Sequence, residues 1–291
     1  MQNKGIDTIR LLETGYNSAA FNMALDEVLM HELELISGRD QISDKILRDN
    51  IIAAPKNWEF SPETLDGEST VEKGQFDFMP GAVLRMYAWR PPAISIGYFQ
   101  SMELEVEVDE CQKRGIDVVR RLTGGGAVYH EAEVTYSFIT NVFPHDILQS
   151  YDLICDPVVK ALRKLGFDAR FAPLNDIVIG NGVKVSGNAQ TRRKNVILQH
   201  GTILLEVDAE KMFRVLKVPS EKMKNKIIDD VKKRVIGIRR PFEEVVSVLK
   251  TSFSEAFDCR LVPDRLTQDE YSNIDLLINE KYSLDSWNWR R

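Results

Sequence analysis

The chain has 291 residues, of which 43% are hydrophobic and 28% are charged. This composition is typical of a globular protein and excludes the disordered, collagen-like and disulfide-stapled classes. The 38 Lys and Arg residues against 44 Asp and Glu give a net charge of −6. We therefore expect no nucleic-acid partner, because nucleic acids are usually bound by a basic surface.

The compartment can also be predicted. No apolar run approaches the roughly 20 residues needed to span a bilayer, so we expect no membrane insertion. The first residues lack the charged and apolar layout of a signal peptide. The three cysteines, Cys111, Cys155 and Cys259, are far apart and show no zinc-ligand spacing. Reduced thiols of this kind are typical of a cytoplasmic protein.

The first predicted elements are a strand and a helix. Residues 8–12 alternate as in a strand, and residues 13–17 predict a turn. Ser18 can cap a helix whose apolar side chains between 21 and 29 recur three and four residues apart. This periodicity is lost over 38–80, which we interpret as an insertion, either a tolerated surface loop or a functional one.

Strand patterns dominate the middle of the chain. We expect strands at 83–89, 94–98, 116–121 and 135–142, helices at 106–115 and 151–165, a hairpin of 176–179 with 183–186, and a strand at 196–207. From about 208 the pattern is mostly helical. Because hairpins require antiparallel neighbours, we predict an α/β (α+β) fold in one domain, 1–291, with a mixed, largely antiparallel sheet flanked by helices.

The sharpest local feature is a run of three glycines, Gly124 to Gly126, at the end of a predicted strand. Such a run is either a tight bend or a cradle in which backbone N–H groups bind phosphate. It matches neither the P-loop nor the dinucleotide-binding spacing. Arg120 and Arg121 precede it, and alternation along the strand predicts that only one of them reaches the site.

Three further signals are weak when each is taken alone. Lys184 lies in the predicted hairpin, where a solvent-facing lysine is the ordinary interpretation, but small residues follow it. His200 lies in an apolar strand, where a structural histidine is more common than a ligand. Asn175 and Asp176 open the hairpin and are compatible with plain turn chemistry.

Four motifs nevertheless follow one another along the chain. They are Arg121-Leu122-Thr123-Gly124-Gly125-Gly126-Ala127-Val128-Tyr129-His130, Asn175-Asp176-Ile177-Val178, Lys184-Val185-Ser186-Gly187-Asn188-Ala189 and His200-Gly201-Thr202-Ile203-Leu204. In this order they resemble the signatures of the lipoate–protein ligase family, within the biotin/lipoate ligase and octanoyltransferase superfamily. The resemblance covers nearly the whole chain except 38–80, and includes Lys281-Tyr282-Ser283 and Trp287-Asn288-Trp289 near the C-terminus.

The resemblance implies a fold similar to class II synthetase cores. It also implies a ligase that uses ATP and Mg²⁺ to convert lipoate to lipoyl-AMP. The lipoyl group would then pass to a lysine of a carrier domain, of the 2-oxoacid dehydrogenase E2 or glycine cleavage H type. Lys184 would be the catalytic residue, because its ammonium can stabilise the charge that develops in both acyl transfers.

The resemblance also assigns binding roles. Adenylate binding falls to Arg121, Gly124, Gly125, Gly126, Ala127, Val128, Tyr129, His130, Asn175, Asp176, Lys184 and Ser186. The lipoate pocket would be lined by Asp26, Trp89, Arg121, Gly126, Gly187, Ala189 and His200. Asp176 is also a candidate ligand for the metal.

The chain departs from two-domain ligases, because it stops at Arg291 where they continue into an accessory domain. It therefore resembles the archaeal-type arrangement, and we expect a separate accessory-domain protein as a possible further partner. Two alternatives stay open. One is an ATP-independent octanoyl or lipoyl transferase, although such enzymes use a cysteine shortly before the strand of Asp176, where this chain has none. Cys155, about twenty residues earlier, is interpreted as a packed thiol. The other alternative is a non-catalytic carrier-binding protein.

Overall fold

The computed structural model describes residues 6–39, 81–218 and 220–291. The strands are β1 (Thr8–Asn17), β2 (Ala82–Trp89), β3 (Ala93–Ile96), β4 (Asp117–Arg120), β5 (Val128–His130), β6 (Glu133–Thr140), β7 (Ala169–Ala172), β8 (Asp176–Ile179), β9 (Val183–Arg193), β10 (Val196–Leu204) and β11 (Arg260–Asp264). The helices are α1 (Ala19–Arg39), α2 (Met102–Glu105), α3 (Val108–Lys113), α4 (Ile147–Lys164), α5 (Ala209–Val215), α6 (Glu221–Arg234), α7 (Phe242–Phe257), α8 (Gln268–Leu277), the π-helical η2 (Ile278–Tyr282) and α9 (Asp285–Asn288).

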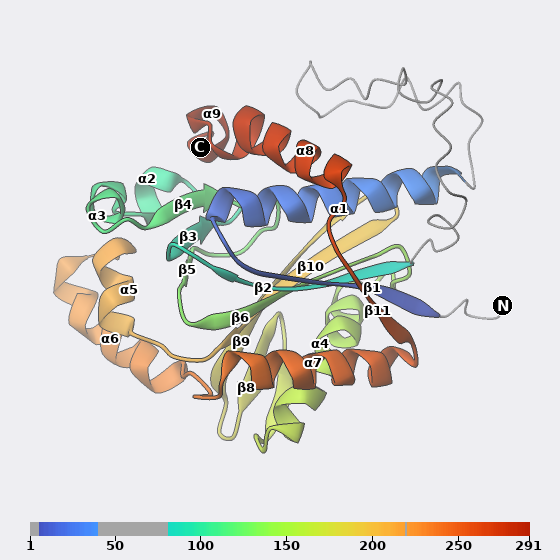
Figure 1. The fold of residues 1–291 in the computed structure, drawn as a ribbon. Coiled ribbons are helices and arrows are strands. Elements are labelled where there is room, and N and C mark those ends of the chain that lie inside the picture. Colours follow the sequence, from blue (N-terminus) through green and yellow to red (C-terminus); the bar gives the residue numbers. More distant parts are fainter. Residues whose placement is uncertain (1–5, 40–80, 219) are drawn as a thin grey trace.

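Eight of these strands form one mixed sheet in the order β11-β1-β2-β6-β10-β9-β8-β7 (Figure 1). β1 runs parallel to both β11 and β2, and each later pair of neighbours is antiparallel. A smaller sheet, in the order β4-β3-β5, lies at one end of the molecule. The predicted fold class is confirmed.

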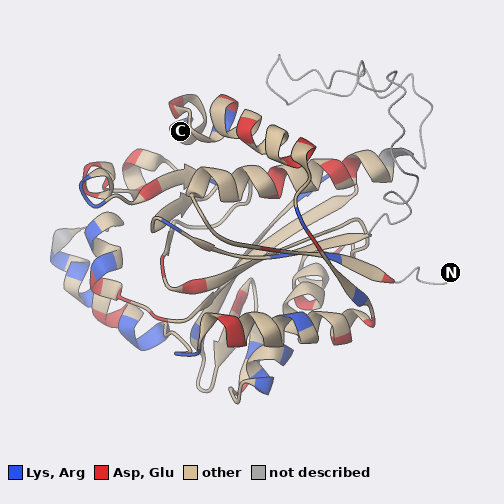
Figure 2. Ribbon diagram, viewed as in Figure 1, with Lys and Arg blue, Asp and Glu red and all other residues tan. Residues whose placement is uncertain are grey.

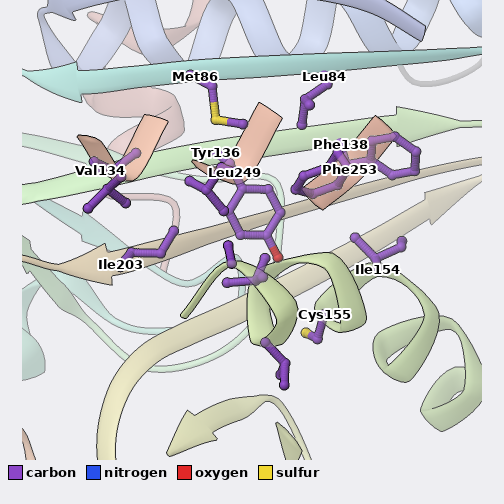
Figure 3. Close-up of a cluster of buried hydrophobic side chains, with 14 of the residues drawn as sticks. Leu84, Met86, Val134, Tyr136, Phe138, Ile154, Cys155, Ile203, Leu249 and Phe253 are labelled. Atoms are coloured by element: carbon purple, nitrogen blue, oxygen red, sulfur yellow. The ribbon is translucent and has the colours of Figure 1, made fainter. Parts of the chain in front are cut away.

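Helices cover both faces of the large sheet. α1 and α8 lie on one face, and α4 and α7 pack together on the other (Figure 1). The side chains between the sheet and the second pair are mostly apolar, including the rings of Phe138 and Phe253 (Figure 3). None of the described helices is long and apolar enough to cross a membrane.

The N-terminal elements differ in one respect from the prediction. Ser18 caps α1 as expected, since its Oγ accepts a hydrogen bond of 3.3 Å from the Phe21 N–H. Residues 13–17, predicted as a turn, instead extend β1. The pairing with β2 shifts register between Glu13 and Gly15, which marks a β-bulge. Gly15 has φ = +66°, a conformation that glycine adopts without strain.

The C-terminal third is mostly helical, as predicted, but it also contributes β11. The sequence did not indicate this short edge strand, because most of its residues are exposed or half-buried and because it contains Pro263, a residue type that rarely occurs inside strands.

The last residues of the chain hold the end of β4 in place. The buried Arg120 guanidinium donates to the carbonyls of Trp287 and Asn288, at 3.1 and 2.9 Å, and also to that of Gly97 at 3.1 Å. The insertion predicted over 38–80 lies, apart from the end of α1, outside the described residues.

Candidate functional site

A cavity of about 300 Å³ lies between the two sheets. Its wall includes residues of β2, β3, β5, β6, β9 and β10, of the loop between β4 and β5, and of the segment that leads from β10 into α5. The volume falls at the small end of the range typical for ligand sites. Of the predicted site residues, the wall includes Trp89, Arg121, Gly125, Gly126, Ala127, Val128, Tyr129, His130, Asn175, Lys184, Gly187, Ala189 and His200.

Lys184 lies on this wall because of an irregularity in the hairpin. The pairing of β8 with β9 shifts register between Ile177 and Val178, and such a bulge changes where the neighbouring side chains point. The ammonium is about one-third exposed, and it contacts the Asp176 carboxylate at 2.7 Å. A Cβ at Gly187 would lie 2.9 Å from Nζ. Glycine at 187 therefore makes room for the lysine head group.

The residues around Lys184 bear on the predicted metal site. Asn175 and Asn188 exchange hydrogen bonds, from each side-chain amide to the other residue's backbone carbonyl, at 2.5 and 3.0 Å. Asp176 already pairs with a cation, and the described residues hold no cluster of three His, Cys, Asp or Glu side chains that could bind a metal ion. The described residues therefore show no site that would hold a metal ion without further ligands from a substrate, and the role of Asp176 as a metal ligand stays a prediction. Ser186, predicted to contact adenylate, is fully buried and does not reach the cavity wall.

The glycine run is a tight loop closed over Arg121. This guanidinium is buried and donates to the carbonyls of Gly124 and Gly126, at 2.7 and 2.8 Å, and to the carbonyl of Ser95 at 2.9 Å. Burial lowers the pKa of Arg121 to about 10, so the side chain remains charged at neutral pH. Arg121 reaches the cavity wall and Arg120 does not, as alternation predicted. Gly124 also lies off the wall.

One hydrogen-bonded chain on the wall joins a hydroxyl, an imidazole and a carboxylate. His130 Nε2 lies 2.8 Å from Ser95 Oγ, and its Nδ1 lies 2.6 Å from Glu133 Oε1. Glu133 also accepts a hydrogen bond of 2.9 Å from Thr135, whose Oγ1 accepts another of 2.9 Å from the Trp89 indole. The Trp89 and His130 rings stack with centroids 4.0 Å apart. These contacts orient the aromatic part of the wall.

A second chain of the same kind lies deeper. His200 Nε2 lies 2.7 Å from Thr123 Oγ1, and its Nδ1 lies 3.3 Å from the carboxylate of Asp26. Asp26 also pairs with the fully buried Arg85 guanidinium at 2.9 Å. Burial lowers the pKa of His200, despite the neighbouring Asp26, so the imidazole is neutral at pH 7. Asp26 itself does not reach the wall.

Both chains meet at the Arg121 guanidinium. Its Nη1 donates to Ser95 Oγ and its Nε to Thr123 Oγ1, each at 3.1 Å. Two histidines, each held by a carboxylate, therefore help to hold the arginine that binds the glycine loop. The sequence predicted no role for Ser95, Thr123 or Glu133. Ser95 and Glu133 are polar residues in otherwise apolar strands, which is a usable signal.

Cys155 lies on the other face of the large sheet, on α4 (Figure 3). Its Sγ accepts a hydrogen bond of 3.4 Å from Gln199, which also donates to the Tyr136 hydroxyl at 2.7 Å. Tyr136 in turn donates to Asn188 Oδ1, on the cavity wall, at 2.7 Å. A Cβ at Gly201 would lie 1.9 Å from that oxygen, so glycine there permits the contact. Burial raises the pKa of the thiol to about 12.

The family model described as the lipoyl protein ligase A/B catalytic domain matches residues 71–257, more than half of the chain. The chain belongs to this family. Among curated relatives, it is 34% identical to an octanoyltransferase LipM of Kyrpidia tusciae, over 98% of this chain and all of the relative. The expected family is confirmed, but this relative is named a transferase rather than a ligase.

Solved structures with the same fold include ligases. One is the bipartite lipoate protein ligase of Thermoplasma acidophilum, described with its E2 lipoyl domain, with a TM-score of 0.77 and 29% identity over 97% of this chain and 96% of that chain. Another is a lipoate-protein ligase A bound with ATP, with a TM-score of 0.72 and 27% identity over 97% of this chain and 98% of that chain. The protein is therefore an enzyme of the lipoate ligase and octanoyltransferase family.

Proposed function

We propose that this protein transfers an octanoyl group, or a similar medium-chain acyl group, from an acyl carrier to a lysine of a lipoyl carrier domain without ATP. The likeness to an octanoyltransferase, at 34% identity over 98% of this chain, carries this choice. The charge of the cavity wall supports it. In its described part, Glu133, Glu206 and Asp208 face Arg121, while Glu131 is paired with Lys211 and Lys184 with Asp176. This excess of negative charge disfavours a triphosphate more than an uncharged thioester.

The cavity wall offers a contact for the alkyl chain of such a donor and another for its thioester carbonyl. Trp89, Tyr87 and Met23 give it an apolar region for the alkyl chain. Lys184 lies on the same wall and is free to move its ammonium towards a reacting carbonyl, because its side chain is about one-third exposed and, among the described residues, forms an ion pair only with Asp176. Its charge would stabilise the oxyanion that forms when the thioester carbonyl is attacked.

Cys155 is the thiol this route would use as an intermediate carrier. Cys111 and Cys259 are buried without a hydrogen-bonded path to the cavity among the described residues, whereas Gln199 and Tyr136 join Cys155 to Asn188 on the wall. The Cys155 sulfur would attack the donor thioester, and its proton would leave on the donor's thiol. The amine of the target lysine would then displace the sulfur, forming the amide and returning a proton to Cys155.

The burial of Cys155 means that its thiol must be activated before it can react by this route. With a pKa raised to about 12 by burial, the Cys155 thiol is protonated at neutral pH. The protonated form is a poor nucleophile. We therefore expect donor binding to shift α4 or Gln199, so that the thiol gains access to the cavity and the field of Lys184 lowers its pKa.

The second candidate is the ATP-dependent lipoate ligase of the sequence analysis. The likeness to a ligase bound with ATP and the presence of Gly125 and Gly126 on the wall favour it. The paired state of Asp176 and the acidic wall count against it.

One assay separates the candidates. Purified protein is incubated with an apo lipoyl domain and either an octanoyl-loaded acyl carrier protein without ATP, or free octanoate or lipoate with ATP and Mg²⁺. We expect the first mixture to modify the domain lysine, and mass spectrometry to find an octanoyl thioester on Cys155. Modification only in the second mixture, with pyrophosphate release, would establish the ligase. Inactivity in both would indicate a carrier-binding protein.

The route through Cys155 has its own control. Cys155→Ser should abolish transfer, while Cys259→Ser, a change at another buried thiol away from the cavity, should leave it intact. Full transfer by a folded Cys155→Ser variant would show direct attack on the donor by the target lysine. That result would remove the cysteine from the mechanism but keep the transferase activity.

A further inference from the structure

The charge of this chain is distributed unevenly. Residues 211–240 contain 11 Lys and Arg against 3 Asp and Glu, whereas the rest of the chain contains 27 against 41. An acidic protein thus carries one strongly basic segment, which we call the basic lobe. Figure 2 shows these cations along α6 and the neighbouring end of α5. Such a concentration creates a local positive field that the net charge conceals.

Several cations of the basic lobe have no ion-pair partner in the part of the chain that the structure describes. Lys232 pairs with Glu210 at 2.7 Å. By contrast, the structure shows no ion pair with a described residue for Lys226, Lys233 or Arg234, all of which are exposed. Ion pairs inside the fold therefore leave a positive surface on α6.

The basic lobe lies beside the catalytic lysine. The Ile236 N–H donates to the Lys184 carbonyl at 3.0 Å, and Val235 lies on the cavity wall. At the other end of the lobe, Met212 is also on the wall, and Leu216 forms a bridge with Val106. Because both ends of the lobe contact elements around the cavity, a molecule bound on α6 would be held next to the site.

The dimensions and surface of α6 suit a protein rather than a small anion. Its 14 residues extend about 21 Å. The exposed side chains of Met223 and Ile236, at 47% and 37%, add apolar area among the cations. A mixed surface of this length is comparable with one side of a small protein–protein interface, which covers about 800 Å².

We propose that the basic lobe is the docking surface for the acidic carrier domain that delivers the acyl thioester. This inference rests on the proposed transferase function, and specifies its donor. An acidic domain with a phosphate-containing prosthetic arm is complementary to the lobe, and its acyl group would enter the cavity beside Lys184. The acceptor lysine carries an ammonium before it reacts, and the lobe repels that charge. Donor and acceptor therefore approach the cavity from different sides.

Charge reversal tests the docking surface. The variant with Lys226→Glu, Lys233→Glu and Arg234→Glu is compared with a control bearing Lys160→Glu, Lys164→Glu and Arg260→Glu, which has the same net charge but changes α4 and β11. Dissociation constants for fluorescently labelled octanoyl-loaded acyl carrier protein and for the apo lipoyl domain are measured by anisotropy, without turnover. Thermal melting confirms that both variants fold.

We expect the α6 variant to weaken donor binding by about tenfold or more, and the control by less than about twofold. Donor binding by the unaltered protein should weaken as salt rises, because screening shortens the reach of these charges. Transfer from octanoyl-pantetheine, which has no carrier domain, should be equal in all three proteins. Binding that is measured without turnover tests docking even if the transferase assay fails.

Three results would overturn the proposal. The first is unchanged donor binding by the folded α6 variant. The second is an equal loss in the control, which would show that only net charge matters. The third is a selective loss of binding to the apo lipoyl domain, which would assign the surface to the acceptor.

Discussion

The two faces of the large sheet near the cavity are built by different means. Along β6, Tyr136 and Phe138 point into an apolar core with α4 and α7 (Figure 3). Thr135 and Ser137, which alternate with them, point to the other face and join the polar chains around Trp89 and Asp26. Apolar contacts are non-directional, whereas hydrogen-bonded charges require defined positions. We therefore expect the two faces to respond differently to substitution.

The largest effect should come from the buried ion pair on the polar face. Asp26→Ala leaves the Arg85 guanidinium buried without its carboxylate, and we expect the free energy of unfolding to fall by about 3–5 kcal/mol. Asp264→Ala is the matched control, because its pair with Arg10 is half exposed on the Asp264 side, and it should cost less than about 1 kcal/mol. Urea denaturation measures both. Equal losses would show that burial does not distinguish the pairs.

Lys184 on the cavity wall should affect chemistry without affecting stability. Lys184→Ala should lower the acyl transfer rate about 10²-fold or more, as expected for the loss of one charge stabiliser. Its melting temperature should be unchanged, because the side chain is partly exposed and makes one ion pair with the described residues. Lys160→Ala, which removes an exposed ion pair on α4, serves as the control. A folded Lys184→Ala variant with normal kcat would exclude Lys184 from catalysis.

The polar face should also depend on pH. Burial lowers the pKa of His200 below its ordinary value of about 6.5, so folding favours the neutral imidazole. Its contribution to stability is complete above pH 6.5 and is lost as the pH falls below that value. The free energy of unfolding between pH 8 and pH 5 should therefore fall more steeply for the unaltered protein than for His200→Gln. Parallel curves would contradict a neutral, buried His200.

The smallest effect should come from the apolar face. Ile203→Val removes one methylene from the core that α4 and α7 cover, and we expect a loss of about 0.5–1.5 kcal/mol. Transfer activity should be unaltered, since the Ile203 side chain lies in the apolar core and does not line the cavity. Calorimetry and the transfer assay check the two halves of this prediction. A fall in activity larger than the fall in stability would show that the faces are coupled.

The sequence predicted features that are local. Hairpin β8–β9, the alternation that separates Arg120 from Arg121, and the small residue beside Lys184 all follow from neighbouring residues. Contacts between residues that are far apart in the sequence could not be predicted in this way. Asp26 was expected in the acyl pocket, but it lies behind the wall, because its partner Arg85 comes from a strand about 60 residues later. The negative charge of the cavity wall, which supports the proposed transferase, also depends on which carboxylates the fold brings to the wall.

The pairing of β1 with β11 has a consequence for biosynthesis. Thr8 aligns with Arg260, so this edge of β1 has no native partner until almost the entire chain has been made. At about 5–20 residues per second, the wait is on the order of 10–50 s. An unpaired strand edge is a template for pairing with other chains. Synthesis of this protein thus includes an interval in which its first strand must be shielded, by a chaperone or by the growing chain itself.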